Sequence, residues 1–167
     1  MSELLQGLAA VSRSDARLLI LGSMPGEKSL HQQQYYAHPR NAFWPVMASL
    51  LGFSPTLSYP QRLQALLEQR VALWDVLGHC LRQGSLDSAI RAEQANDFAH
   101  FLQQHRHIRA IAFNGAKAWQ SFRRQVIPVQ PLPEPLQFIQ LPSTSPAHAS
   151  LNFAGKLQQW QQLSSHL

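Results

Sequence analysis

Residues 35–44 bring together side-chain types that could hold a flat ring and position a water molecule. The stretch reads YYAHPRNAFW and contains two tyrosines, a histidine, an arginine, an asparagine and a Phe-Trp pair. Tyrosines in a polar loop can form a stacking platform for a nucleobase, and Pro39 stiffens the chain ahead of Asn41. Asn41 also lies where a helix N-cap belongs, and asparagine is a favoured cap residue. Taken alone, these residues favour a cap at Asn41 and core packing for Phe43 and Trp44.

Two further stretches, residues 22–26 and 142–148, combine turn formers with hydrogen-bonding groups. The first, GSMPG, lets the backbone turn sharply and approach a ligand closely, but it does not match the glycine patterns of nucleotide-phosphate motifs. The second, PSTSPAH, offers hydroxyls and backbone amides that can bind a phosphate. Each stretch also fits an ordinary turn, because Ser and Thr form turns that cap helices. No G-x-S-x-G motif is present, so a serine hydrolase is not indicated.

Asp75 and the histidines are the remaining candidates for acid–base or metal chemistry. Asp75 lies inside the apolar run VALWDVL, so its carboxylate must reach the rim of the fold or find a partner. It could orient a loop or a water molecule, and a general-base role is the weaker interpretation. The eight histidines form no H-E-x-x-H pattern, so the sequence predicts no metal site. His148 remains a candidate because it follows the last apolar run.

Four short apolar runs predict strands, and helical patterns lie between them. The strands are expected at residues 17–23, 71–77, 108–114 and 136–142. The helices are expected at residues 41–53, 59–70, 96–105, 115–126 and 152–163. Strands that alternate with helices imply right-handed crossovers and a parallel sheet covered on both faces. Ligands bind such sheets beyond the carboxyl ends of the strands, so we expect the polar stretches to meet at that edge.

Length and composition bound the class of protein. The 167 residues suggest one domain, residues 1–167, that is large enough for a core without disulfides or metal. One cysteine, Cys80, excludes a disulfide framework and fits a reducing cytosol. No signal peptide or membrane-spanning run is evident, so a soluble, cytoplasmic protein is expected. The net charge of +5 suits a phosphate-rich partner, and it suits an ordinary soluble surface equally well.

The order of these stretches resembles the uracil-DNA glycosylase superfamily, especially its mismatch-specific and hypoxanthine-DNA glycosylase branches. Members of the mismatch branch carry a G-x-N-P-G turn after the first strand, then an aromatic-Ala-His-Pro-x-Asn-x-Phe-Trp run, and a Pro-Ser-rich loop after the last strand. Here GSMPG, YAHPRNAFW and LPSTSPAH stand in these places, and IAFNGAKAWQSF is similar to the third strand and its helix. The resemblance runs from about Leu18 to His148. It implies an α/β fold, a three-layer α/β/α sandwich with a central, mainly parallel four-stranded sheet.

The resemblance also implies a role for each motif. Met24 replaces the catalytic asparagine of the mismatch branch, so the implied catalytic residue is Asn41, which holds the attacking water. The implied base pocket consists of Gly22, Ser23, Met24, Pro25, Tyr36, His38, Phe43, Asp75 and Asn114. The implied DNA contacts are Arg40, Ser143, Thr144, Ser145 and His148. His148 or its neighbours are also expected to fill the gap that the flipped nucleotide leaves.

The resemblance therefore implies a monofunctional DNA glycosylase of base excision repair. Such an enzyme flips a deaminated base, with hypoxanthine as the leading substrate, out of DNA and hydrolyses its N-glycosidic bond. It implies damaged DNA as the partner, no cofactor, no membrane and a monomer. No catalytic lysine is evident near the motifs; the nearest, Lys28, is expected in a loop. Three alternatives stay open: a uracil or mismatch-specific glycosylase, a catalytically degenerate DNA-binding module, and a nucleosidase acting on free nucleosides.

Overall fold

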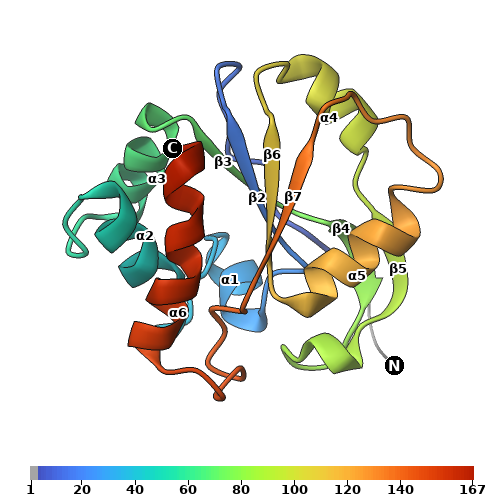
Figure 1. The fold of residues 1–167 in the computed structure, drawn as a ribbon. Helices are drawn as coiled ribbons and strands as arrows, with labels where there is room; N and C mark the ends of the chain where they lie inside the picture. The colour runs from blue at the N-terminus through green and yellow to red at the C-terminus, as the bar shows by residue number, and fades with distance from the viewer. Residues whose placement is uncertain (1–3) are drawn as a thin grey trace.

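A four-stranded parallel sheet forms the centre of the computed structural model, which describes residues 4–167 (Figure 1). The strands run in the order β3-β2-β6-β7. Their bounds are β2 Leu18–Gly22, β3 Val71–Asp75, β6 Ala110–Asn114 and β7 Gln137–Leu141. Each of the four apolar runs therefore holds one strand of this sheet. The inner strands β2 and β6 are buried along their whole length, which is typical of a parallel sheet covered on both faces.

Each predicted helical stretch contains a helix. Their bounds are α2 Phe43–Leu51, α3 Tyr59–Glu68, α4 Phe98–Gln104, α5 Ala116–Gln125 and α6 Phe153–Trp160. Local signals set several ends: Ser58 and Gln61 form a capping box on α3, and Asp97 caps α4. The helix α2 ends at Gly52, whose φ of +76° suits glycine. A 3-10 turn, η2 Gln161–His166, continues α6.

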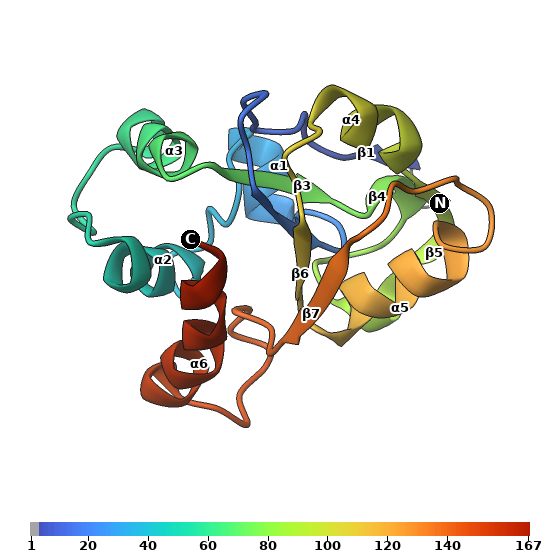
Figure 2. The same ribbon diagram turned by 45° about the horizontal axis from the view of Figure 1, so that its top comes forward.

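The helices form two layers, one on each face of the sheet. α2, α3 and α6 cover one face, and α4 and α5 cover the other (Figure 1, Figure 2). The side chains of β2 alternate between these layers: Leu18 and Ile20 pack with α2 and α6, whereas Leu19 and Leu21 pack with α4 and α5. The expected three-layer α/β/α sandwich is therefore confirmed.

A second, antiparallel sheet was not predicted from the sequence. Its order is β1-β4-β5, with bounds β1 Leu4–Gln6, β4 Leu77–Leu81 and β5 Arg91–Ala95. The apolar run 71–77 therefore ends β3 at Asp75 and begins β4 at Leu77, instead of forming one strand. The sequence of β5, RAEQA, is short and polar and has no β-branched residue, so it carries no strand signal.

One short helix, α1 Glu27–Gln32, is also absent from the prediction. It follows the GSMPG turn and places Lys28 on a helix instead of in the expected loop. With six residues it is too short to show a clear amphipathic pattern, so periodicity gives no signal for it.

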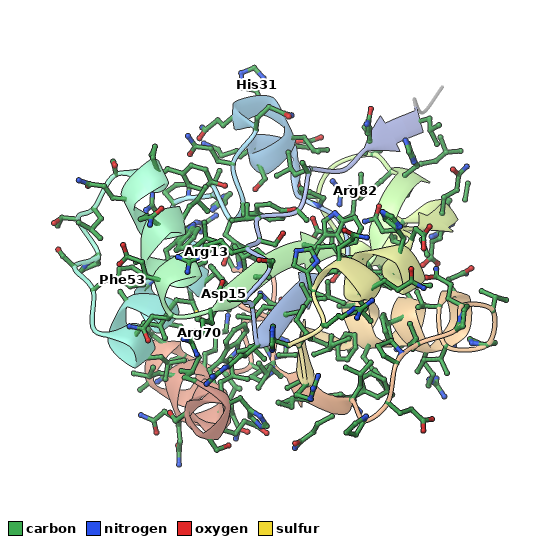
Figure 3. All side chains as sticks on the ribbon, turned by 90° about the horizontal axis from the view of Figure 1, so that it is seen from above. Arg13, Asp15, His31, Phe53, Arg70 and Arg82 are labelled. Carbon is green, nitrogen blue, oxygen red and sulfur yellow. The ribbon has the colours of Figure 1, made fainter. Side chains whose placement is uncertain are left out.

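An ion-pair cluster lies at the amino ends of the parallel strands. Arg13 donates two hydrogen bonds to Asp15, at 3.1 and 2.7 Å, and Arg70 lies 3.8 Å from the same carboxylate. Asp15 precedes β2 and Arg70 precedes β3, so the cluster lies at the opposite end of the sheet from the strand ends that carry the polar motifs (Figure 3).

Candidate active site

A cleft of about 970 Å³ lies at the carboxyl ends of the parallel strands. Its walls come from α1, from the loop after β7 and from the connection between β4 and β5, elements that gather at one end of the sheet in Figure 1. Most of the predicted site residues line it: Gly22, Ser23, Met24, Pro25, Tyr36, His38, Asn41, Asp75, Asn114, Ser143, Thr144, Ser145 and His148. Phe43 and Arg40 are not among the lining residues.

Gly22 is the point at which two other site residues come together. β2 and β3 pair in a register that places Gly22 beside Asp75. A Cβ atom on residue 22 would lie 2.6 Å from Asp75 Oδ1 and 3.2 Å from the Tyr36 hydroxyl. Both groups are buried, so a Cβ atom at residue 22 would fit only if the Asp75 carboxylate shifted from its place. Glycine is therefore required here for the close approach of a carboxyl group and a phenol.

Asp75 carries a carboxyl group that is poorly satisfied by the protein. The residue is 4% exposed, and its Oδ2 accepts no hydrogen bond from residues 4–167. Burial is the main cause that raises the pKa of Asp75 to about 7. The negative charge of Asp87 adds to this rise, and the Arg82 guanidinium opposes it. The carboxyl group therefore changes its protonation state close to neutral pH.

Tyr36 lines the cleft, and Phe43 supports it. The two rings are stacked with centroids 3.9 Å apart and planes 19° apart. Phe43 itself is fully buried and meets Trp44 and Trp160 edge-on, so it backs the tyrosine instead of lining the pocket as expected. The φ of Tyr36 is +55°, an unusual conformation for a bulky residue, which this packing must hold. Tyr35 is buried, so of the two tyrosines Tyr36 is the better stacking platform.

Asn41 combines the two roles that its position suggests. The N-cap position of α2 is Ala42, one residue after the expected Asn41, but Asn41 Oδ1 accepts a hydrogen bond from the Phe43 N–H at 2.9 Å and so still satisfies the first N–H of the helix. The residue also lines the cleft. The cap contact fixes the plane of the amide while a second lone pair of Oδ1 remains available. Nearby, the Arg40 N–H donates to His38 Nδ1 at 3.1 Å, and the Arg40 side chain is exposed.

Asn114 and Thr144 join the end of β6 to the loop after β7. Asn114 Nδ2 donates to Thr144 Oγ1 at 2.9 Å, and the Thr144 N–H donates to Asn114 Oδ1 at 2.9 Å. The Thr144 carbonyl also accepts from the Ala42 N–H at 3.0 Å, next to Asn41. Thr144 is 1% exposed, so its side chain braces the site instead of facing solvent as a DNA contact would.

We expect the Thr144→Val substitution to lower the free energy of unfolding by about 1–3 kcal/mol, because it leaves the buried Asn114 amide without its acceptor. Urea denaturation measures the change. The matched control is Thr56→Val, because the Thr56 hydroxyl bonds Ser54 on an exposed loop; its effect should stay within about 0.5 kcal/mol. Equal effects in the two variants would show that the buried pair contributes nothing specific.

Internal hydrogen bonds hold the loop after β7. Ser143 Oγ accepts from the Ser145 N–H at 3.1 Å, and Ser145 Oγ accepts from the Ala147 N–H at 3.2 Å. The buried Lys156 of α6 donates to the Ser145 carbonyl at 3.0 Å, and burial lowers the pKa of this lysine. The two serines therefore form the turns that their residue types indicate, and they line the cleft as well.

The connection between β4 and β5 forms a wall of the cleft that the sequence analysis missed. Ser85, Leu86, Asp87 and Ser88 line the cleft from this connection, which contains the 3-10 turn η1 Asp87–Ala89. It is bonded to the GSMPG turn, because Ser23 Oγ donates to Asp87 Oδ1 at 2.6 Å. No local pattern in residues 82–90 indicates this contact, since it depends on the unpredicted second sheet.

Two basic residues of the lining, Arg91 and Lys117, were not indicated by the sequence, and Lys28 lines the cleft as well. Lys117 donates to Glu93 at 2.9 Å, and the pair is partly buried. Positive side chains beside a cleft suit a polyanion such as DNA. The cleft therefore holds two lysines, although the sequence indicated none beside the motifs apart from Lys28.

Two other kinds of feature are absent from the part of the chain that the structure describes, residues 4–167. No group of three or more histidine, cysteine, aspartate or glutamate side chains is placed to hold a metal ion. None of the helices in this range has both the length and the apolar character needed to cross a bilayer.

Comparison with known proteins gives consistent results. The sequence model of the Uracil DNA glycosylase superfamily matches residues 9–164. A hypoxanthine DNA glycosylase of Methanosarcina acetivorans is 39% identical over 114 residues, which cover 68% of this chain and 72% of the relative. A protein of the same name from Methanosarcina barkeri is 36% identical with the same coverage. A solution NMR structure of a Methanosarcina acetivorans protein, named as a candidate uracil DNA glycosylase, superimposes with a TM-score of 0.81 at 32% identity and covers 98% of both chains.

Proposed function

The chain belongs to the uracil DNA glycosylase superfamily, and we propose that it is a monofunctional DNA glycosylase that excises a deaminated base, hypoxanthine first, in base excision repair. The observation that carries the proposal is that Asn41, Tyr36 and the serine loop after β7 line one cleft. The names of the two Methanosarcina relatives support hypoxanthine as the substrate. The proposal includes a single domain that acts as a monomer in the cytoplasm, with damaged DNA as its partner and without a cofactor.

The proposed complex holds a nucleotide that has left the base stack, because the glycosidic bond cannot be reached inside a duplex. The base stacks on Tyr36, whose ring is supported by Phe43 at 3.9 Å. Backbone groups of Ser23 and Met24 meet the edge of the base, and Asn114 braces or contacts it. The remaining wall consists of Gly22, Pro25, His38 and Asp75.

Asn41 holds the attacking water in this proposal. Its Oδ1 uses one lone pair for the Phe43 N–H and offers the other to a water O–H. An amide is no base at neutral pH, but none is needed if the glycosidic bond breaks first through an oxocarbenium-like state. The electron pair of the C1′–N bond then leaves with the base, which takes up a proton. The water oxygen forms the new bond to C1′ and releases one of its protons.

Met24 supports the ranking of hypoxanthine above uracil. It is the third residue of GSMPG and is 6% exposed, packed in the core cluster that includes Leu21 and Phe98. A thioether is only a weak acceptor, so it cannot orient a water as an amide does. The proposed chemistry therefore depends on Asn41 alone, and excision of uracil in the manner of the mismatch branch is not expected.

Residues around the cleft opening supply the proposed DNA contacts. Ser143, Ser145 and His148 line the cleft and contact the phosphates that flank the flipped nucleotide. Arg40 is exposed between the lining residues His38 and Asn41, and it reaches a neighbouring phosphate. Thr144 acts indirectly, through its hydrogen bonds to Asn114.

The proposed enzyme hydrolyses the bond without forming a Schiff base, although Lys28 and Lys117 lie in the cleft lining. Lys117 is paired with Glu93, so its ammonium group is held by a carboxylate. Borohydride should therefore trap no covalent complex with DNA that contains hypoxanthine. A trapped complex that is lost in Lys28→Ala or Lys117→Ala would contradict the monofunctional assignment.

The test of the function uses end-labelled duplexes that contain hypoxanthine, uracil, xanthine or ethenocytosine, followed by alkaline cleavage at abasic sites. We expect cleavage at hypoxanthine, and none in the Asn41→Ala variant. Strong cleavage at uracil would favour the uracil-type alternative, and retained DNA binding without any cleavage would favour a binding module. Release of base from free deoxyinosine would instead indicate a nucleosidase.

A further inference from the structure

We propose that Leu86 is the side chain that enters the DNA base stack when the target nucleotide flips out. The inference rests on the proposed function, since it concerns the step that delivers the base to the cleft. It assigns this step to the β4–β5 connection, whereas the sequence placed it in the loop after β7 at His148 or its neighbours.

Leu86 stands apart from the other exposed apolar side chains of residues 4–167. It is 57% exposed and lies in the lining of the cleft. The other large hydrophobic side chains that are exposed lie outside this lining: Leu4, Ile127, Val129, Phe153 and Leu167. A single exposed leucine is ordinary on a protein surface. An exposed leucine at the opening of a cleft that takes up a flipped base is in the right place to contact the DNA.

The residues on both sides of Leu86 are anchored. Ser85 Oγ accepts from the Glu27 N–H at 2.9 Å, and Asp87 Oδ1 accepts from Ser23 Oγ at 2.6 Å. The Leu86 carbonyl accepts from the Ala89 N–H at 3.1 Å within the η1 turn. The backbone at Leu86 is therefore tied to the GSMPG turn, which forms part of the proposed base pocket.

Three residues before Ser85, Arg82 extends this anchoring into the core. The residue is 5% exposed, and its Nη2 donates to the Pro25 carbonyl at 2.6 Å. The connection is thus bonded to the GSMPG turn through Arg82 and Asp87, and to the first residue of α1 through Ser85. A side chain on such a fixed backbone can be inserted into DNA without first ordering a flexible loop.

The chemistry of the gap favours leucine over the side chains on the loop after β7. A flipped nucleotide leaves an apolar slot between two base pairs, and proteins that unstack DNA insert Phe, Leu, Ile, Met or Pro into such steps. On the loop after β7 the corresponding residues are Pro146, Ala147 and His148, and His148 Nε2 lies 3.3 Å from Ser150 Oγ. Leu86 is the larger apolar side chain, and it carries no polar atom that would lose its hydration in the stack.

The test compares Leu86→Ala with the matched control Val129→Ala, which shortens an exposed apolar side chain outside the cleft. The substrates are a duplex with hypoxanthine and the same hypoxanthine strand without its complement. We expect Leu86→Ala to lower kcat/KM on the duplex by about tenfold, because alanine buries much less apolar surface between the base pairs than leucine does. Excision from the single strand should stay unchanged, since it contains no base pair to unstack. Val129→Ala should match the wild type on both substrates.

A binding measurement makes the inference independent of catalysis. The fluorescence of 2-aminopurine placed beside the hypoxanthine rises when this base is unstacked. We expect the rise on adding protein to be several times smaller with Leu86→Ala than with the wild type. With Leu86→Met the rise should be largely restored. If the wild type excises nothing, the proposed function fails, while this fluorescence difference still supports or overturns the role of Leu86. Equal losses on single and double strands, or a duplex-specific loss in His148→Ala but not in Leu86→Ala, would overturn it.

Discussion

The Asn41→Ala variant should excise hypoxanthine on the order of 10²–10³-fold more slowly than the wild type, the loss typical of removing one positioned polar group from a reacting centre. In the structure Asn41 lines the cleft and its amide is oriented by the Phe43 N–H at 2.9 Å. Alanine keeps the backbone but removes the oxygen that holds the water. Single-turnover rates with saturating enzyme measure the chemical step, and DNA affinity should change by less than about threefold.

The control must separate the proposed chemistry from the loss of a helix cap. Asn152 is suited to this, because its side chain accepts from the Gly155 N–H at 2.9 Å at the start of α6. It is absent from the lining of the cleft. Asn152→Ala should cost about 0.5–2 kcal/mol of stability and leave the rate per folded molecule unchanged. If Asn41→Ala behaved in the same way, Asn41 would be a cap residue and the catalytic assignment would be wrong.

The Asp75→Asn variant should gain stability relative to the wild type as the pH rises from about 4 to about 7. The pKa of Asp75 is raised from 3.8 to about 7 in the folded protein, mainly by burial. In this window the folded carboxyl group keeps its proton and the unfolded one loses it, so the wild type loses stability as the pH rises. The difference between the two proteins should grow by about 1.4 kcal/mol per pH unit, to roughly 3–4 kcal/mol, and level off above pH 7.

Urea denaturation at half-unit steps from pH 4.5 to pH 8 measures this difference. Glu134→Gln is the control, because Glu134 is an exposed carboxylate and its substitution should give a constant offset. The neighbouring charges of Asp87 and Arg82 are present in both proteins, so they largely cancel in the comparison. A difference between Asp75→Asn and wild type that does not change with pH would mean that Asp75 is ionised throughout and that its environment is more polar than its burial indicates.

The predictable part of the site follows from the parallel sheet. The apolar runs that form β2, β3, β6 and β7 are strong signals, because buried strands must be apolar on both faces. Once these strands are parallel, their carboxyl ends lie at one edge, so Gly22, Asp75, Asn114 and the serine loop must be neighbours. The proximity of these groups could be deduced without coordinates.

Other features depended on contacts between distant segments. The orientation of Phe43 behind Tyr36, and the burial of Thr144 against Asn114, arise from packing that no local pattern encodes. The same is true of Arg40, which the sequence places in the motif and the structure leaves exposed outside the cleft lining. Residue type and spacing indicate which segment approaches the ligand, but the direction of each side chain depends on its neighbours in space.

By itself the sequence determined the three-layer fold, some of the helix ends and the edge at which the site lies, because these depend on local hydrophobicity, turn chemistry and strand direction. The tertiary structure alone decided that a second sheet brings residues 82–90 against the GSMPG turn, with Asp87 bonded to Ser23 and Leu86 at the cleft. Strand β5 of the second sheet is too short and polar to be predicted from the sequence. It is stabilised by pairing with β4 instead. The sequence therefore predicted the part of the cleft formed by the ends of the parallel strands. The wall formed by residues 82–90 could be seen only in the folded chain.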